Sequence, residues 1–186
     1  MYFIVLDLNS VNEGDLVFNA SDVNSKKINF MAKNGRGLIC LTLNKNQANK
    51  LGLTFMAPVN QSRNQTAFTI SIEAKKGITT GISAKDRSRT IKVATKKNVL
   101  KNEIVSPGHV FPIISREGGV LVRAGHTEAS VDIARLGNKI PAAVICEIMN
   151  EDGSMAKGDD LLKFASKHKL HLSLIHISEP TRQIRI

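Results

Sequence analysis

The chain has 186 residues, of which 42% are hydrophobic, so it is long enough to bury one core and does not require a second domain. Lys and Arg number 26 against 16 Asp and Glu, and the resulting net charge of +10 favours an anionic partner. No apolar run reaches the roughly 18 residues of a membrane span, and the N-terminus lacks a secretory pattern, so we expect a cytoplasmic protein.

The basic residues occur mainly as scattered doublets, such as Lys26-Lys27 and Lys96-Lys97, rather than as one stripe. With no Trp and one Tyr, the chain also offers few rings on which bases could stack. These features argue against nucleic acid as the partner. They leave a lysine-rich solvated surface, or the phosphate of a small substrate, as the alternatives.

Apolar runs and capping residues predict alternating strands and helices in the first half of the chain. In chain order these are a buried strand over 2–6, a loop over 12–15, an extended segment over 16–18, a helix from Ser21 or Asp22 to about Gly35, a strand over 37–43, a helix from Asn44 to Gly52 and a half-buried strand over 67–73. Cys40 and Cys146 lie in apolar runs, which indicates small buried side chains in a reducing compartment.

The second half continues the same rhythm. Its expected elements are a helix over 84–96, a strand over 110–115, a strand over 120–123, a helix over 127–136, a strand over 142–149 and a helix over 157–168. Strands that alternate with helices, with some direct links between strands, predict an α+β fold: a single domain with a mixed β-sheet covered by helices.

Several hydrogen-bond donors coincide at the start of the helix predicted over 84–96. Ser83 and Asp86 have the spacing of a capping box, the Thr79-Thr80-Gly81 turn precedes them, and Arg87 follows. Such a place can hold a phosphate or carboxylate through backbone N–H groups and the helix dipole. The alternative is an ordinary capped helix.

Two histidines lie in glycine-flanked, polar segments, where a core residue would be poorly placed. His109 follows Gly108 and precedes an apolar run, which predicts a position at the mouth of a strand, where its ring can titrate near neutral pH or bind a metal. His126 comes just before a predicted helix, with Arg123 and Thr127 near it. This cluster suits a phosphorylated ligand, and His126 could coordinate a divalent metal; a lone surface histidine is the alternative.

Three carboxylates also stand out. Glu147 interrupts a predicted interior strand, where burial would raise its pKa and make it a general acid or base near neutrality. The alternative is a strand edge that faces water. Glu13 and Asp15 flank Gly14 at the end of the first strand and could bind Mg²⁺ or sugar hydroxyls.

Five separated segments resemble the 3,4-dihydroxy-2-butanone 4-phosphate synthase family, in order and in spacing. They are Asn12–Asp15, Thr80–Arg87, Pro107–Pro112, Gly125–Ala129 and Cys146-Glu147. The resemblance covers about residues 5–170. It implies a three-layer fold and a Mg²⁺- or Mn²⁺-dependent lyase of riboflavin biosynthesis, which converts D-ribulose 5-phosphate into L-3,4-dihydroxybutan-2-one 4-phosphate and formate. It also implies a homodimer with active sites at the subunit interface.

The resemblance assigns roles to individual residues. His109 and Glu147 would be the essential catalytic pair, and His126 would be a metal ligand. The residues that would contact the substrate are Asp15, Arg123, Ala124, Gly125, His126, Thr127 and Glu147.

The chain departs from the family pattern at the metal site and at both ends. Ser10 and Val11 stand where the family has Arg and a metal-binding Glu, and a valine cannot bind a metal, so Glu13 would have to substitute. This leaves a second hypothesis, a non-catalytic homologue that retains the fold and the dimer. We expect a synthase-like domain over 1–172, shortened before its first strand, and an atypical, artefactual tail over 173–186.

Overall fold

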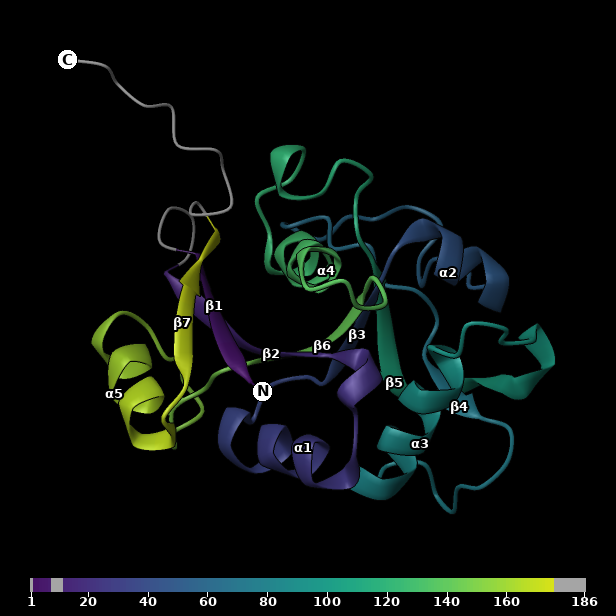
Figure 1. Cartoon of the computed structure of the whole chain (residues 1–186), viewed down its shortest axis with the longest axis horizontal. Helices are drawn as coiled ribbons and strands as arrows, with labels where there is room; N and C mark the ends of the chain where they lie inside the picture. The colour runs from purple at the N-terminus through teal and green to yellow at the C-terminus, as the bar shows by residue number, and fades with distance from the viewer. Residues whose placement is uncertain (1, 8–11, 176–186) are drawn as a thin grey trace.

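The computed structural model describes residues 2–7 and 12–175 and contains one seven-stranded mixed sheet (Figure 1). The strands are β1 (Phe3–Asp7), β2 (Glu13–Asn19), β3 (Cys40–Leu43), β4 (Ile72–Ala74), β5 (Ile104–Ile114), β6 (Ala142–Glu147) and β7 (His171–Leu174). Their spatial order is β4-β5-β3-β6-β2-β1-β7. The β3–β5 and β1–β7 pairs are parallel, and the other pairs are antiparallel.

Helices cover both faces of this sheet, which confirms the predicted α+β class. They are α1 (Ser25–Phe30), which continues into a π-helix over Met31–Gly35, then α2 (Lys45–Leu51), α3 (Ala84–Ala94), α4 (His126–Leu136) and α5 (Asp159–His168). Short 3-10 helices span Ala20–Asp22, Lys101–Glu103 and Gly119–Leu121. In Figure 1, α4 lies on one side of the sheet, and α1, α3 and α5 lie on the other.

The period-two alternation of the strands creates a separate core on each face. The smaller core, under α4, contains Val17 of β2 and Ile145 of β6 together with Ala129 of α4. The larger core contains Leu16, Phe18 and their neighbours on the opposite face. Because side chains alternate, Asp15 and Glu147 fall on the face covered by α4.

Local signals predicted several element ends correctly. Asn44 caps α2 by accepting a hydrogen bond from the Gln47 N–H (2.8 Å), and Gly52 ends the helix at a positive φ of 64°. Ser83 accepts from the Asp86 N–H (3.0 Å) at the start of α3, and Gly137 follows the last residue of α4.

Three predictions were wrong because longer-range contacts decide these segments. The predicted loop over 12–15 is strand from Glu13 onward, since β2 pairs with both β1 and β6. The predicted strand over 120–123 is replaced by the 3-10 helix over Gly119–Leu121, which begins after Gly118 at a positive φ of 91°. Ser21 and Asp22 lie in a 3-10 helix, and Asn24 caps α1.

Other strands differ from the prediction in length. Of the strand expected over 67–73, only the last residues join β4, while Phe68 and Thr69 form isolated bridges. At the C-terminal end, β7 pairs with β1 across the expected domain boundary at residue 172. Ser10, Val11 and residues 176–186 lie outside the described residues, so the artefactual tail stays a prediction.

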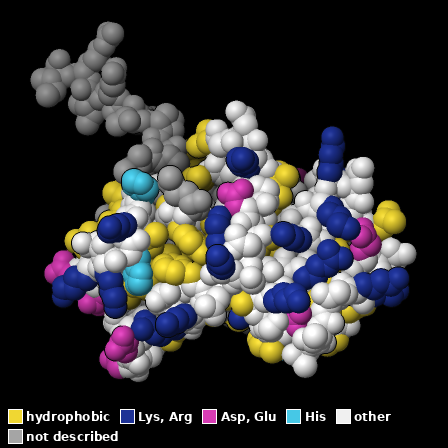
Figure 2. Space-filling model, turned by 60° about the horizontal axis from the view of Figure 1, so that its bottom comes forward, with side chains coloured by type: hydrophobic (Ala, Val, Ile, Leu, Met, Phe, Trp, Pro, Cys, Tyr) yellow, Lys and Arg dark blue, Asp and Glu magenta, His cyan; other side chains and the backbone are white. Residues whose placement is uncertain are grey.

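Three expectations from composition hold in the described part of the chain. Cys40 and Cys146 are free and buried, and burial raises the pKa of the Cys146 thiol to about 12. No helix is long and apolar enough to cross a membrane. Lys and Arg are spread over the face seen in Figure 2 in separate groups rather than in one stripe.

The turn before α3 is filled from within the protein, so of the two alternatives it is the ordinary capped helix and not a phosphate site. Asp86 is 2% exposed, and its Oδ2 accepts hydrogen bonds from the Thr79 hydroxyl (2.7 Å), the Thr79 N–H (3.2 Å) and the Gly81 N–H (3.1 Å). The bond from the Thr79 hydroxyl is the main cause that holds the pKa of Asp86 below its ordinary value. The carboxylate thus occupies the donors that a phosphate would have used.

We expect Asp86→Asn to lower the melting temperature at about pH 7, because a neutral amide oxygen accepts these bonds more weakly than a carboxylate. A depressed carboxyl pKa contributes stability above the unfolded-state pKa and loses it as the pH falls through the folded-state value. The deficit should therefore shrink when thermal unfolding is repeated near pH 3. Asp22→Asn, at an exposed aspartate, is the control, and an equal deficit at both pH values would contradict this account.

Candidate active site

Two carboxylates meet on the face of the sheet that α4 covers. Asp15 of β2 and Glu147 of β6 are direct partners in the strand register, and Asp15 is 5% exposed. Burial raises the pKa of both carboxyls above their ordinary values, and the charge of Asp15 raises that of Glu147 further. The pair therefore favours binding a proton or a cation.

The segment before β3 fixes the position of Glu147. The Leu38 N–H donates a hydrogen bond to Glu147 Oε2 (2.8 Å). A Cβ atom at Gly37 would lie 2.6 Å from both the carbonyl oxygen and Oε2 of Glu147, so only glycine leaves room for this close approach. Glu147 is partly buried as the last residue of β6, so its place is intermediate between the predicted interior position and the alternative at a strand edge.

His126 is the first residue of α4 and faces the carboxylates. Its Nδ1 lies 3.7 Å from Asp15 Oδ1, an arrangement that favours the ionised form of Asp15. Its Nε2 is buried and has no hydrogen-bond partner in the described structure. His126 therefore offers a divalent cation one unpaired nitrogen, on a ring whose other nitrogen faces Asp15, as the first member of a donor set.

This donor set is incomplete as a metal site in one chain. Among residues 2–7 and 12–175, no three His, Cys, Asp or Glu side chains converge closely enough to hold a metal ion. Val11, where the resemblance implies a second metal ligand, lies outside these residues. Glu13, the predicted substitute, forms an ion pair with Lys157 (3.5 Å).

An arginine adjoins the N-terminus of α4. Arg123 Nη1 pairs with Glu128 Oε2 at 2.6 Å, and Glu128 is 1% exposed. Gly125 is the N-cap residue, and a Cβ atom there would lie 2.4 Å from Arg123 Nη1. With no capping side chain, the N–H groups of the first turn stay available, so this end of α4 suits an anion.

The remaining residues predicted to grip the substrate lie around this helix end. Ala124 is exposed just before Gly125, and Thr127 is buried in the first turn. The structure therefore brings together six of the predicted residues, in one region near the end of β6. They are Asp15, Arg123, Ala124, Gly125, Thr127 and Glu147, with His126 between the two groups.

His109 is the exception. It lies within β5 rather than in a turn, its side chain is 45% exposed, and its Nδ1 contacts Glu73 Oε1. Cys40 of β3 pairs with Phe111 of the parallel strand β5 and with Ile145 of the antiparallel strand β6. His109 comes two residues before Phe111, and Glu147 comes two residues after Ile145. Both therefore lie at the same end of the sheet, on either side of β3. Two strand spacings put their backbones about 10 Å apart. No hydrogen bond or ion pair among the described residues joins them.

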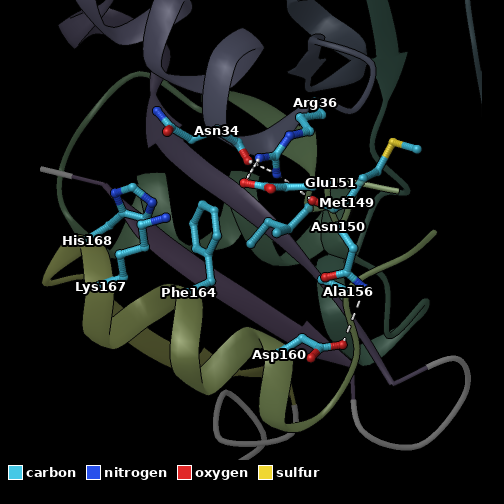
Figure 3. A pocket seen from close by; sticks show the side chains of 11 residues that line it. Asn34, Arg36, Met149, Asn150, Glu151, Ala156, Asp160, Phe164, Lys167 and His168 are labelled. Carbon is cyan, nitrogen blue, oxygen red and sulfur yellow. Dashed lines mark hydrogen bonds and ion pairs between the residues drawn. The ribbon is translucent and has the colours of Figure 1, made fainter. Parts of the chain in front are cut away.

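Two cavities lie apart from these residues. One of about 110 Å³, on the sheet face opposite α4, is lined by α5, by the segment that precedes it and by Asn34 and Arg36 (Figure 3). In it Arg36 donates to the Met149 carbonyl (2.9 Å) and pairs with Glu151 (3.3 Å), so its polar groups bind one another. A second, of about 340 Å³, is lined by Lys75, Lys76, Arg89 and three neighbours.

The sequence analysis did not single out Gly37, Glu73 or Glu128 as functional residues. Gly37 looked like the start of a strand, and its close contact with Glu147 depends on the pairing of β3 with β6. Glu73 looked like a surface residue of a half-buried strand. The only sequence signal for Glu128 was its place in the Gly125–Ala129 segment, three residues after the N-cap.

Comparisons with known proteins identify the family of the chain. The family model of 3,4-dihydroxy-2-butanone 4-phosphate synthase matches residues 1–179. The synthase of Neisseria meningitidis serogroup A is 53% identical over 164 residues, which are 88% of this chain and 45% of the relative.

Solved structures show the same fold. A two-domain synthase from A. baumannii has a TM-score of 0.90 and 46% identity, over 94% of this chain and 52% of that one. A synthase in complex with two magnesium ions has a TM-score of 0.88 and 35% identity, over 94% of this chain and 87% of that one. The chain spans about half the length of the Neisseria and A. baumannii proteins. It belongs to the 3,4-dihydroxy-2-butanone 4-phosphate synthase family.

Proposed function

We propose that the chain converts D-ribulose 5-phosphate into L-3,4-dihydroxybutan-2-one 4-phosphate and formate, a step of riboflavin biosynthesis. The observation that carries this proposal is the carboxylate pair of buried Asp15 and partly buried Glu147, with His126 beside Asp15 and its Nε2 left unpartnered. Family membership supports the same reaction. The predicted cytoplasmic location is part of the proposal.

The phosphate of the substrate would bind at the N-terminus of α4. The first-turn N–H groups and Arg123 present donors of positive potential there, and the missing side chain of Gly125 leaves room for the guanidinium beside them. The pairing with Glu128 holds the guanidinium in place while part of it remains exposed. A sugar bound in this way would extend toward Asp15 and Glu147.

Glu147 would move protons in the reaction. The conversion requires proton removal next to a carbonyl, loss of water, a shift of the carbon skeleton and release of formate, and each proton transfer needs a group that titrates near neutrality. Burial and the charge of Asp15 raise the pKa of Glu147 toward that range. The Leu38 N–H holds one carboxylate oxygen, which leaves the other to exchange a proton.

A divalent cation, Mg²⁺ or Mn²⁺, would be held by His126 Nε2, while Asp15, which lies beside Nδ1 on the other side of the ring, would orient the imidazole. When bound, such an ion supplies electrostatic stabilisation of enediolate oxygens. The residues of this chain would orient the sugar and exclude water around it. Because one imidazole is a weak site for a hard cation, we expect oxygens of the substrate to complete the coordination.

A homodimer would bring His109 into the site. In one chain, the ring of His109 turns to Glu73 and lies about two strand spacings from Glu147. Around α4, the side chains of Leu121, Val122 and Leu136 are largely exposed. Several exposed apolar side chains in one region suit a contact with a second subunit. His109 of the partner subunit would then act as the second acid or base.

We expect the purified chain to release formate from D-ribulose 5-phosphate with Mg²⁺, and to stop when EDTA removes the metal. His109→Ala and Glu147→Ala should each lower kcat by about 100-fold or more with little change in melting temperature, because each removes a proton-transfer group. His171→Ala, at an exposed histidine of β7, is the control for loss of an imidazole. Unchanged turnover in either catalytic variant would overturn its assigned role.

Val11→Glu, assayed in parallel, tests the family's second metal ligand. If the site lacks only that ligand, the variant should release formate faster and at a lower Mg²⁺ concentration than the parent chain. Equal formate release by the two chains would show that another group replaces the ligand. Release by neither would support the non-catalytic homologue.

A mixing experiment tests whether the site is shared between subunits. When inactive His109→Ala and Glu147→Ala chains are unfolded together and refolded, half of the dimers should be mixed, and each of these has one intact composite site. Formate release should recover to about a quarter of the wild-type rate. If His109 and Glu147 act within one chain, mixing will restore nothing.

Asp15→Asn should stabilise the fold at about pH 7 in metal-free buffer. When the pKa of a carboxyl is raised by folding, the free energy of unfolding falls as the pH rises from the ordinary pKa, 3.8 for Asp15, toward the folded-state pKa. An amide does not titrate, so it has no such cost. The gain in melting temperature should therefore vanish near pH 3. Glu117→Gln, at an exposed glutamate, is the control, and a gain that persists at acid pH would contradict this explanation.

A further inference from the structure

We propose that Glu73 is a positioning residue that orients His109 by holding its Nδ1. Glu73 Oε1 contacts His109 Nδ1, and the Glu73 side chain is 16% exposed, so it is largely removed from solvent. No role at Glu73 was evident in the sequence. The inference rests on the proposed function insofar as that function assigns proton transfer to His109.

An irregularity in the sheet aims the two side chains at each other. Ile72 of β4 pairs with Val110 of β5, but the next residue, Glu73, pairs with Val105. Residues 106–109 of β5 are therefore extra in the ladder at this point. Bulges of this kind redirect side chains, and they are common beside active sites.

Two glycines form the walls around the Glu73 carboxylate. A Cβ atom at Gly108 would lie 2.2 Å from the Ile72 backbone and 2.3 Å from Glu73 Cγ. A Cβ atom at Gly81 would lie 1.7 Å from Glu73 Oε1 and 2.7 Å from His109 Nδ1. Gly81 also has a positive φ of 88°, so any side chain there would be both strained and obstructed. A side chain at Gly81 would therefore collide with Glu73 and His109, and one at Gly108 would collide with Glu73 and the Ile72 backbone.

The wall at Gly81 is itself fixed. Asp86 accepts hydrogen bonds from the Thr79 hydroxyl and from the Gly81 N–H, which holds the turn against the pair. On the other side, the Gly108 N–H donates to the Ser71 hydroxyl (3.0 Å). Both walls are thus anchored by hydrogen bonds that do not involve Glu73 or His109.

The chemical consequence concerns the tautomer of His109. A neutral imidazole has one N–H and one acceptor nitrogen, and a carboxylate at Nδ1 places the hydrogen there. Nε2 is then the acceptor, and it is the nitrogen that remains to take a proton from substrate. Without Glu73, the ring could rotate and change tautomer, and only a fraction of molecules would present Nε2.

The test compares Glu73→Gln with Glu103→Gln in formate release. Glu103 is a matched control because it also forms an ion pair, but with Lys96 (2.6 Å) and not with His109. We expect Glu73→Gln to lower kcat by about 10-fold or more while KM changes by less than about 2-fold, because substrate contacts remain intact. Glu73→Asp should not restore kcat, since its carboxylate stops short of Nδ1. Glu103→Gln should match the parent chain.

A second measurement does not depend on activity. The ¹⁵N shifts of His109, assigned by their loss in His109→Ala, should show the Nδ1–H tautomer in the parent chain and a mixture in Glu73→Gln. A mixed tautomer in the parent chain, or unchanged kcat in a folded Glu73→Gln protein, would overturn the inference. Full activity of His109→Ala would instead refute the proposed function, and the ¹⁵N shifts would still decide whether Glu73 holds the ring.

Discussion

The burial of two neighbouring carboxylates is the constraint on which the rest of the site depends. Asp15 and Glu147 lie opposite each other on β2 and β6, where their ionised carboxylates are less stable than they would be in water. The Leu38 N–H and the His126 imidazole each stabilise one of them, but neither cancels both charges. The pair therefore retains an affinity for protons and cations, which is the property that an acid–base reaction on a sugar phosphate requires.

The short central strand makes this arrangement possible. Because β3 begins at Cys40, the Leu38 N–H is free of the ladder and can bind the Glu147 side chain, and Gly37 lets the two strands approach. The same end of β3 separates Glu147 from His109. One chain therefore binds each member of the proposed catalytic pair, Glu147 through Leu38 and His109 through Glu73, but keeps the two residues apart. This is the geometry expected if the second member comes from another subunit.

The sequence predicted the features that local chemistry decides and missed those that strand pairing decides. Asn44, Gly52 and Gly137 mark helix ends through their own backbone preferences, so α2 and α4 were predicted within a residue or two. The start of β2 at Glu13 depends on its two neighbours in the sheet, and no local pattern reports them. Glu73 was missed for the same reason, since its contact with His109 exists only because the β4–β5 register shifts.

The two long helices with an acid three residues after the N-cap show why a pattern alone cannot locate an anion site. In α3 the acid is Asp86, which turns to the preceding loop and uses the donors there. In α4 the acid is Glu128, which turns to Arg123, and the missing side chain of Gly125 gives that arginine its place beside the helix end. The first arrangement closes a helix N-terminus to anions, whereas the second adds a cation to an open one. The partner that the acid finds in the fold decides which arrangement the helix adopts. In both helices a partner lies five residues before the acid: Gly81 before Asp86, and Arg123 before Glu128.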